Sequence, residues 1–152
     1  MKWTITLIIF LLLPISSFEY EYIFTISLEE KIEVFEEKSF EEKVLLVFFL
    51  QESNLDTLAY NKTEEALGIL QIRPVMLEDA NRILGEEKFK LEDRLCVEKS
   101  VEMFWIIQNY YNPNLDLELA AHIWNGGPAK IKSRWKFTEK YRNEIIEKFN
   151  NI

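Results

Sequence analysis

Residues 39–53 read SFEEKVLLVFFLQES, and this stretch decides the fold that the sequence predicts. Ser39, followed three residues later by Glu42, forms a capping-box pattern that opens a helix. The seven consecutive apolar residues Val44–Leu50 are typical of a helix buried on all sides, although a buried strand fits the same run. The cap and the Glu/Lys-rich first turn favour the helix. It ends abruptly at a polar segment, so the carboxylate of Glu52 lies at the end of a buried apolar element.

The rest of the chain carries further helix signals and few signals of a sheet. Four glycines are too few for a turn-rich β fold, and no repeat or linker divides the sequence. Residues 54–65 are polar and are expected to form a loop. We predict a mostly α fold, a single domain of roughly six or seven helices around one buried central helix. A capping box at Ser27 is expected to begin a helix that ends near Glu37, and Pro74 to begin one that ends at Gly85. Asp93 is expected to cap a helix that runs to about Tyr111, and a further helix is expected to begin at Leu117 and to end before Asn125-Gly126-Gly127-Pro128. Thr138 is expected to cap the last helix.

The composition indicates a globular domain and excludes some partners. The 152 residues are 48% apolar and 14% aromatic, which is enough for one real core. A net charge of −8 argues against nucleic acid or an anionic membrane surface as a partner. An anionic polymer such as a glycan could bind only if the acidic side chains lie away from the cleft, or if contacts with neutral sugars dominate the binding. Cys96 is the only cysteine, so no intramolecular disulfide is possible; we expect it to pack, and we expect neither a metal nor another cofactor.

The first residues have the pattern of an export signal. Lys2 is followed by the mostly apolar run Ile5–Leu13 and by the small residues Ser16 and Ser17. The run is shorter than the ~20 residues that span a bilayer comfortably. We therefore predict a signal peptide over residues 1–17, a mature domain over 18–152, and a periplasmic or extracellular location. An uncleaved N-terminal membrane anchor is the alternative.

Three short segments carry side chains suited to chemistry. The first is Gln51-Glu52-Ser53, a carboxylate that follows the apolar run. The second is Gly68-Ile69-Leu70-Gln71-Ile72, an amide within an apolar segment, and the third is Trp124-Asn125-Gly126-Gly127-Pro128. Together they offer a candidate acid, two amides for hydrogen bonding and an aromatic face.

The order and content of these segments resemble the soluble lytic transglycosylase (SLT) domain family, which has the lysozyme-like α+β fold. The family pattern is Glu-Ser, then Ala and a polar residue, then Gly-Leu-Met-Gln, then Tyr-Asn-Ala-Gly, and last Thr-x-x-Tyr. The resemblance covers roughly Phe40 to Ile146. Here Glu65 replaces a family glycine, Leu70 a methionine and Trp124 a tyrosine. The matching residues are Glu52-Ser53, Ala59 with Asn61, Ala66 with Gly68-Ile69-Leu70-Gln71, Ile123-Trp124-Asn125-Gly126-Gly127-Pro128, and Thr138 with Tyr141.

The resemblance implies a peptidoglycan lytic transglycosylase with Glu52 as its only catalytic acid/base. In that family one Glu donates a proton and later accepts one, while the substrate's N-acetyl group stabilises the cation. The muramyl 6-hydroxyl then attacks and gives a 1,6-anhydro product. The implied partners are peptidoglycan glycan strands, with a monomeric enzyme and secretion or envelope machinery as a further candidate partner.

The residues themselves support Glu52 for this role. An exposed Glu has a pKa of about 4.3 and is ionised at neutral pH. Burial against Val47 and Phe48 would raise its pKa by desolvation and keep it protonated. The alternative is a solvated carboxylate at a helix end. Asp56, four residues further on, is the nearest second carboxylate in sequence and is expected to be solvated in the loop.

The remaining candidate residues each have a structural alternative. Substrate binding is the functional interpretation of Ser53, Gln71, Trp124, Asn125 and Tyr141. Ser53 could instead cap the loop, Gln71 and Asn125 could serve as structural caps, and Trp124 and Tyr141 could be core residues. By family analogy, Tyr141 would hydrogen-bond Glu52.

Two rival functions remain open at this point. A hydrolytic muramidase on the same fold would show a second carboxylate across the cleft. An inactive wall-binding or assembly protein would bind the wall without turnover. His122, the only histidine, is expected to be packed or at the surface rather than catalytic.

Overall fold

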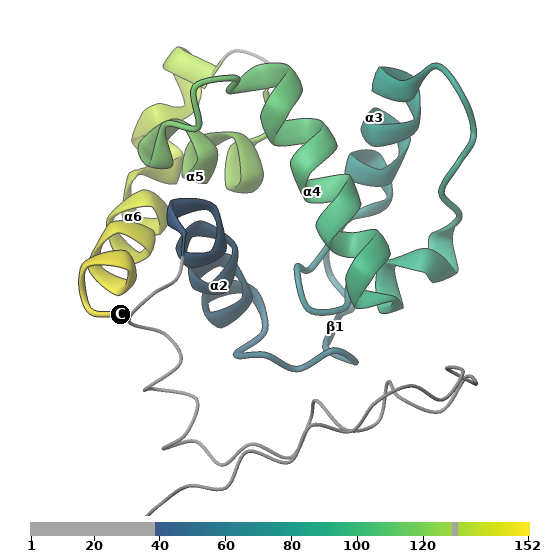
Figure 1. Cartoon of the computed structure of the whole chain (residues 1–152), viewed down its shortest axis with the longest axis horizontal. Coiled ribbons are helices and arrows are strands. Elements are labelled where there is room, and N and C mark those ends of the chain that lie inside the picture. The colour runs from purple at the N-terminus through teal and green to yellow at the C-terminus, as the bar shows by residue number, and fades with distance from the viewer. Residues whose placement is uncertain (1–38, 129–130) are drawn as a thin grey trace, which may run out of the picture. The chain divides into compact units, whose positions relative to one another are not determined.

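The computed structural model describes residues 39–128 and 131–152, which lie in one compact unit, Lys38–Ile152. The expected signal peptide and the helix expected after Ser27 lie outside these residues. The described part is mostly helical, as predicted (Figure 1). Its helices are α2 (Phe40–Glu52), α3 (Pro74–Leu84), the short 3₁₀ helix η3 (Leu91–Leu95), α4 (Val97–Tyr111), α5 (Leu117–Gly126) and α6 (Ile131–Asn150). None of the helices described is both long and apolar enough to cross a bilayer.

Helix α2 forms as its cap predicts. The Ser39 hydroxyl accepts a hydrogen bond from the Glu42 N–H at 3.2 Å, and the Glu42 carboxylate accepts one from the Ser39 N–H at 2.8 Å. Val44, Val47 and Phe48 are completely buried, and the apolar residues between them are half-buried. The run that also fitted a strand is therefore a helix with one fully buried face.

The core joins α2 to the helices that follow it. The Phe48 ring meets the Phe104 ring of α4 edge-on, with 5.0 Å between centroids. The Trp124 ring of α5 lies 4.8 Å from Phe104 and 6.3 Å from Phe48. Tyr141 of α6 contacts Phe48 on another side. The buried end of α2 is thus held by α4, α5 and α6, and this contact fixes where the helix delivers Glu52.

Two expected caps are wrong. Asp93 does not start the long helix: its carboxylate accepts from the Lys90 N–H at 2.9 Å and from Lys99 Nζ at 2.6 Å, so it caps η3, and α4 begins only after Cys96. Thr138 lies inside α6, which is already helical from Ile131. Its side chain is buried and its hydroxyl contacts His122 Nδ1, because the helix passes close to α5 at this point.

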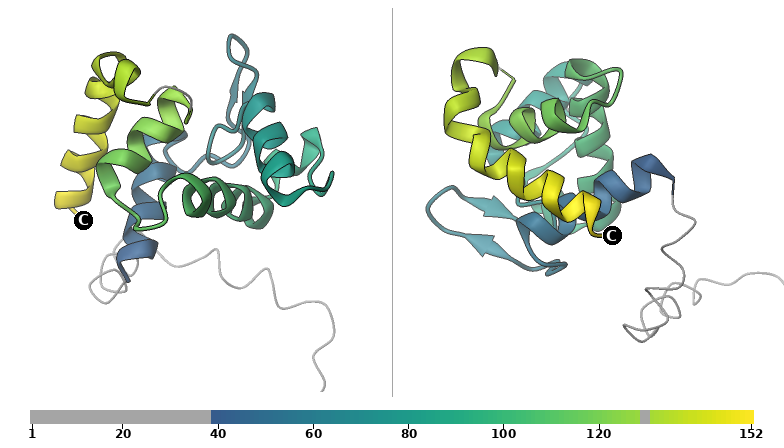
Figure 2. Two further views of the ribbon diagram at one scale, coloured as in Figure 1. Left: turned by 90° about the horizontal axis from the view of Figure 1, so that it is seen from above. Right: turned by 90° about the vertical axis from the view of Figure 1, so that its left-hand side faces the viewer.

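A small hairpin takes up the second half of the segment expected to be a loop. Strands β1 (Tyr60–Asn61) and β2 (Ala66–Leu67) pair antiparallel, with Tyr60 opposite Leu67 (Figure 2). The Asn61 side chain accepts from the backbone N–H groups of Thr63 and Glu64 and so orders the turn. The tip residues and both residues of β1 are exposed, whereas Ala66 of β2 is buried.

Gly68 and Arg94 fix the base of the hairpin. A Cβ at Gly68, which has φ +78°, would lie 2.0 Å from the carbonyl oxygen of Arg94, so only glycine fits there. The buried Arg94 guanidinium donates to the carbonyls of Glu65 at 2.7 Å and Ile72 at 3.0 Å. These contacts hold the segment between the two carbonyls in place, and that segment includes Gln71.

Candidate active site

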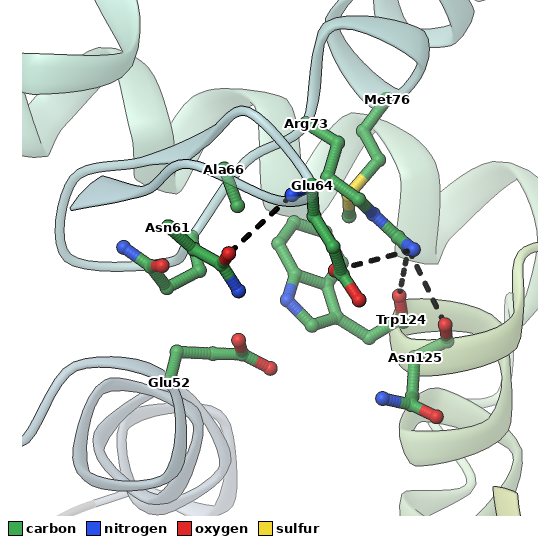
Figure 3. A pocket seen from close by; sticks show the side chains of 9 residues that line it. Glu52, Asn61, Glu64, Ala66, Arg73, Met76, Trp124 and Asn125 are labelled. Atoms are coloured by element: carbon green, nitrogen blue, oxygen red, sulfur yellow. Dashed lines mark hydrogen bonds and ion pairs between the residues drawn. The ribbon is translucent and has the colours of Figure 1, made fainter. Parts of the chain in front are cut away.

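Four segments that are distant in sequence enclose one polar cavity of about 120 Å³ (Figure 3). They are the end of α2, the hairpin, the segment leading into α3, and the end of α5. The cavity is lined by Glu52, Asn61, Glu64, Ala66, Gln71, Arg73, Met76, Trp124 and Asn125. The structure therefore brings together one residue or more from each of the three segments that the sequence singled out.

Glu52 is the chemically unusual group in this cavity. Burial raises the pKa of Glu52 from 4.5 to about 7, and the nearby Glu64 carboxylate adds to the rise. A hydrogen bond from Tyr141 and the positive charge of Arg73 act in the opposite direction but are outweighed. Near neutral pH the carboxyl group can therefore be found both protonated and ionised, as a general acid/base requires.

Tyr141 holds the Glu52 side chain. Its hydroxyl, which comes from α6, donates a hydrogen bond to Glu52 Oε1. Burial and the neighbouring carboxylate raise the pKa of Tyr141 well above 10, so the phenol keeps its proton and remains a donor. Tyr141 does not line the cavity. It positions Glu52 from behind, as the family analogy implied, rather than facing a substrate.

Ser53 and Gln71 serve the local structure. The Ser53 hydroxyl donates to the carbonyl of Ile69 at 2.9 Å and lies 3.3 Å from the carbonyl of Phe49, which ties the end of α2 to the Gly68–Ile72 segment. Gln71 Nε2 donates to the carbonyls of Ala59 at 3.0 Å and Gly68 at 2.9 Å. Its amide nitrogen is thus engaged within the loop, and only its Oε1 is left to face the cavity that it lines.

Trp124 and Asn125 differ in their surroundings. Trp124 is 2% exposed, and its indole N–H donates to the carbonyl of Leu70 at 3.3 Å, so most of the ring belongs to the core. Asn125 is exposed and its side chain makes no hydrogen bond to any described residue. Of these two, Asn125 is the one whose side chain is available to a ligand.

A comparison with protein-family models agrees with this arrangement. The model described as "Transglycosylase SLT domain" matches residues 32–147. The chain belongs to the transglycosylase SLT domain family. Members of this family are glycan-cleaving enzymes of the kind that acts on peptidoglycan. Searches among curated proteins and among solved structures found no match.

In this SLT domain the sequence interpretation missed Arg73 and Glu64. Arg73 Nη2 donates to the carbonyls of Trp124 at 3.0 Å and Asn125 at 3.3 Å, which anchors the entrance of α3 to the end of α5. Arg73 Nη1 lies 3.9 Å from Glu64 Oε2 on the hairpin. The signal available in the sequence was that Arg73, two residues after Gln71, is the only basic residue between Lys62 and Arg82.

Glu64 gives the SLT domain a second carboxylate on the cavity that holds Glu52. Figure 3 shows both carboxylates pointing into this space from opposite sides. Asp56, the nearest acid in sequence, is exposed; its carboxylate accepts from the Leu58 N–H at 2.9 Å and lies outside the cavity. Among residues 39–128 and 131–152, no group of His, Cys, Asp and Glu side chains is arranged to hold a metal ion.

Proposed function

We propose that the protein is a peptidoglycan lytic transglycosylase that cleaves the β-1,4 bond between N-acetylmuramic acid and N-acetylglucosamine. One observation carries the proposal: Glu52 is a half-buried carboxyl group with a pKa of about 7, held by Tyr141 at the wall of a polar cavity. Cleavage of a glycosidic bond needs a proton for the leaving oxygen at a pH where ordinary carboxyl groups are ionised.

In this reaction the Glu52 carboxyl group acts twice, first as an acid and then as a base. Protonated Glu52 gives its proton to the glycosidic oxygen as the C1–O bond breaks, and the N-acetyl group of the substrate stabilises the cation. The resulting carboxylate then takes the proton of the muramyl 6-hydroxyl as its oxygen bonds to C1. The products are a 1,6-anhydromuramyl end and a free 4-hydroxyl, and Glu52 is again protonated. A pKa near 7 suits both directions of this transfer.

A groove beside the cavity supports a polymeric substrate. This groove of about 500 Å³ shares Arg73 and Met76 with the Glu52 cavity and continues between α3, α4 and the end of α5. Its surface includes Val75, Tyr111 and Pro128, whose apolar faces suit sugar rings. Sugars next to the cleaved bond would lie here.

The test compares Glu52→Gln with the wild type and with Asp56→Asn on purified cell walls. Glu52→Gln keeps an acceptor for Tyr141 but cannot donate the proton, so turbidity clearing should fall roughly 10²–10⁴-fold. Asp56→Asn, a matched loss of one carboxylate outside the cavity, should clear walls at the normal rate. Normal clearing by Glu52→Gln would refute the assignment. A wild type that binds walls without clearing them would favour a wall-binding role.

Glu64 makes hydrolysis the second candidate function. In a hydrolytic muramidase, a second carboxylate takes a proton from the water that attacks C1 or stabilises the cation. Mass analysis of the wild-type product distinguishes the two reactions. An anhydro end is lighter than a reducing end by the mass of one water, about 18 Da. If hydrolysis is correct, Glu64→Gln should lose the reducing product.

We also propose that the enzyme is exported, since its substrate lies outside the cytoplasm. The proposal rests on the pattern of Lys2 and the Ile5–Leu13 run. N-terminal sequencing of the secreted protein should find a start between Ser16 and Tyr22. A membrane-bound protein that retains Met1 would point to an uncleaved anchor instead.

A further inference from the structure

We propose that Arg73 is a receptor for a carboxylate group of the glycan strand, next to the site of cleavage. The inference rests on the proposed function and adds to it the chemical group that the enzyme recognises. It concerns a residue that is absent from the motifs of the sequence and that lines both the Glu52 cavity and the neighbouring groove.

The hydrogen bonds of Arg73 leave one side of its guanidinium open. Nη2 is bound to the carbonyls of Trp124 and Asn125, and Nε faces the Met76 sulfur at 3.5 Å. Nη1 has only Glu64, at 3.9 Å, which is longer than a hydrogen bond. The Arg73 side chain is 26% exposed, and no other cationic side chain of the described residues lines the Glu52 cavity. A ligand carboxylate can therefore bind Nη1 without breaking the contacts that hold Arg73.

The start of α3 adds to the attraction for an anion. Arg73 immediately precedes this helix, and its contact with Met76 places the guanidinium beside the first helical turn. The amino end of a helix carries partial positive charge. The first turn has no acidic side chain to neutralise it. The positive charge of Arg73 and the partial positive charge of the helix end therefore attract an anion to the same position.

Glu64 is the competitor that a ligand must replace. Its side chain is 57% exposed, on a turn of the hairpin, so its weak pairing with Arg73 is easily exchanged. A carboxylate that binds Nη1 directly gains a charge-assisted hydrogen bond that Glu64 does not make at this distance. Removal of the Glu64 charge should therefore strengthen the binding of an anionic ligand, which is the reverse of what the loss of a contact residue does.

Peptidoglycan supplies the carboxylate from one of two sources. The lactyl group of N-acetylmuramic acid ends in a free carboxylate where the stem peptide has been removed, and the peptide has carboxylates of its own where it remains. A lactyl carboxylate is free only after hydrolysis of the amide bond that joins it to the peptide. Recognition by Arg73 would also explain how a chain with a net charge of −8 binds an anionic polymer.

The experiment measures binding in the Glu52→Gln background, so that no probe is consumed. The probes are neutral N-acetylglucosamine oligosaccharides, peptide-free glycan with lactyl carboxylates, and peptide-bearing glycan. We expect one carboxylated probe or both to bind roughly five- to twentyfold more tightly than the neutral probe at low salt, as for a partly exposed charged hydrogen bond. Added salt should reduce this preference.

Three second substitutions test the role of Arg73. Arg73→Gln should abolish the preference for the carboxylated probe, and Glu64→Gln should increase that preference a few-fold. Lys88→Gln removes the same charge from an exposed pair with Glu102 and should leave the preference unchanged. The probe that carries the preference identifies lactyl or peptide carboxylate as the source.

The inference is overturned if all three probes bind equally to the Glu52→Gln protein, or if Glu64→Gln weakens the carboxylated probe. The Glu64→Gln result decides the matter even if Arg73→Gln fails to fold after the loss of its bonds to α5. Wall clearing by Glu52→Gln itself would refute the proposed function instead, so the two failures are distinguishable.

Discussion

Replacement of Glu52 by Gln should stabilise the folded protein, and by an amount that depends on pH. The folded state raises the pKa of this carboxyl group from 4.5 to about 7, mainly through burial. Below pH 4.5 the group is protonated in both the folded and the unfolded state, so its ionisation costs nothing. As pH rises towards 7, Glu52 ionises in the unfolded chain before it ionises in the folded protein. The free energy of unfolding therefore falls.

The size of the effect follows from the two pKa values. Each pH unit between them is worth about 1.4 kcal/mol, so the loss grows to about 3 kcal/mol once the pH exceeds the folded-state value. The amide of Gln does not ionise, and it can still accept the hydrogen bond from Tyr141. The free energy of unfolding of Glu52→Gln minus that of the wild type should therefore rise between pH 4.5 and about 7 and then level off.

Urea unfolding at several pH values between about 4 and 8.5 measures this difference directly. Asp56→Asn is the matched control, because it removes a carboxylate from an exposed loop and keeps the acceptor for the Leu58 N–H. The curve for Asp56→Asn is the baseline against which the curve for Glu52→Gln is compared. If the Glu52→Gln curve does not rise above this baseline, Glu52 is not desolvated in the folded state, and the physical argument for its role as an acid fails.

Three further substitutions test the surroundings of Glu52. Tyr141→Phe removes a donor that lowers the pKa of Glu52, so the alkaline limb of kcat against pH should move to higher pH while kcat near pH 7 falls. Gln71→Ala removes two hydrogen bonds to loop carbonyls and should lower the free energy of unfolding by about 1–3 kcal/mol; a rate loss at unchanged stability would instead indicate substrate contact. Gly68→Ala places a Cβ 2.0 Å from a carbonyl oxygen at positive φ, and should cost about 3 kcal/mol or more by the same unfolding measurement.

Helix α2 could be predicted from the sequence because its determinants are local. The capping box spans Ser39 to Glu42, and both of its hydrogen bonds form. The same holds for α3, where Pro74 begins the helix and Gly85 ends it with φ 75°. In each of these helices, the residue that caps the helix bonds to backbone groups no more than four residues away.

The wrong caps show the limit of that local reasoning. Asp93 is competent to cap α4, but Lys90 and Lys99 offer its carboxylate other partners, and the result is a separate 3₁₀ turn. Thr138 likewise has the chemistry of a cap, yet α6 starts seven residues earlier and uses the threonine to pack against α5. A side chain that can cap does so only when the backbone around it has no better arrangement.

The contacts that complete the site join residues that are distant in sequence, and no pattern in the sequence predicts them. Tyr141 and Glu52 are 89 residues apart, and only the family resemblance linked them. Arg73 and Glu64 meet because the hairpin folds back over the start of α3, and neither belongs to a motif of the sequence. The sequence therefore predicted that Glu52 lies at the end of a largely apolar helix, but not which charges surround it.

The placement of those charges matters for the role that we propose for Glu52, because a nearby cation lowers the pKa of a carboxyl group. An arginine paired directly with the carboxylate would favour the ionised form and remove the proton that the reaction needs. In this structure the Arg73 guanidinium is turned towards the carbonyls of α5, and Glu64 offsets part of its charge. Burial then outweighs the remaining attraction, and the pKa of Glu52 stays near 7. The bonds from Arg73 to the end of α5 thus allow one cavity to contain both a carboxyl group that is still partly protonated at neutral pH and the cation that we propose as the receptor for an anionic substrate.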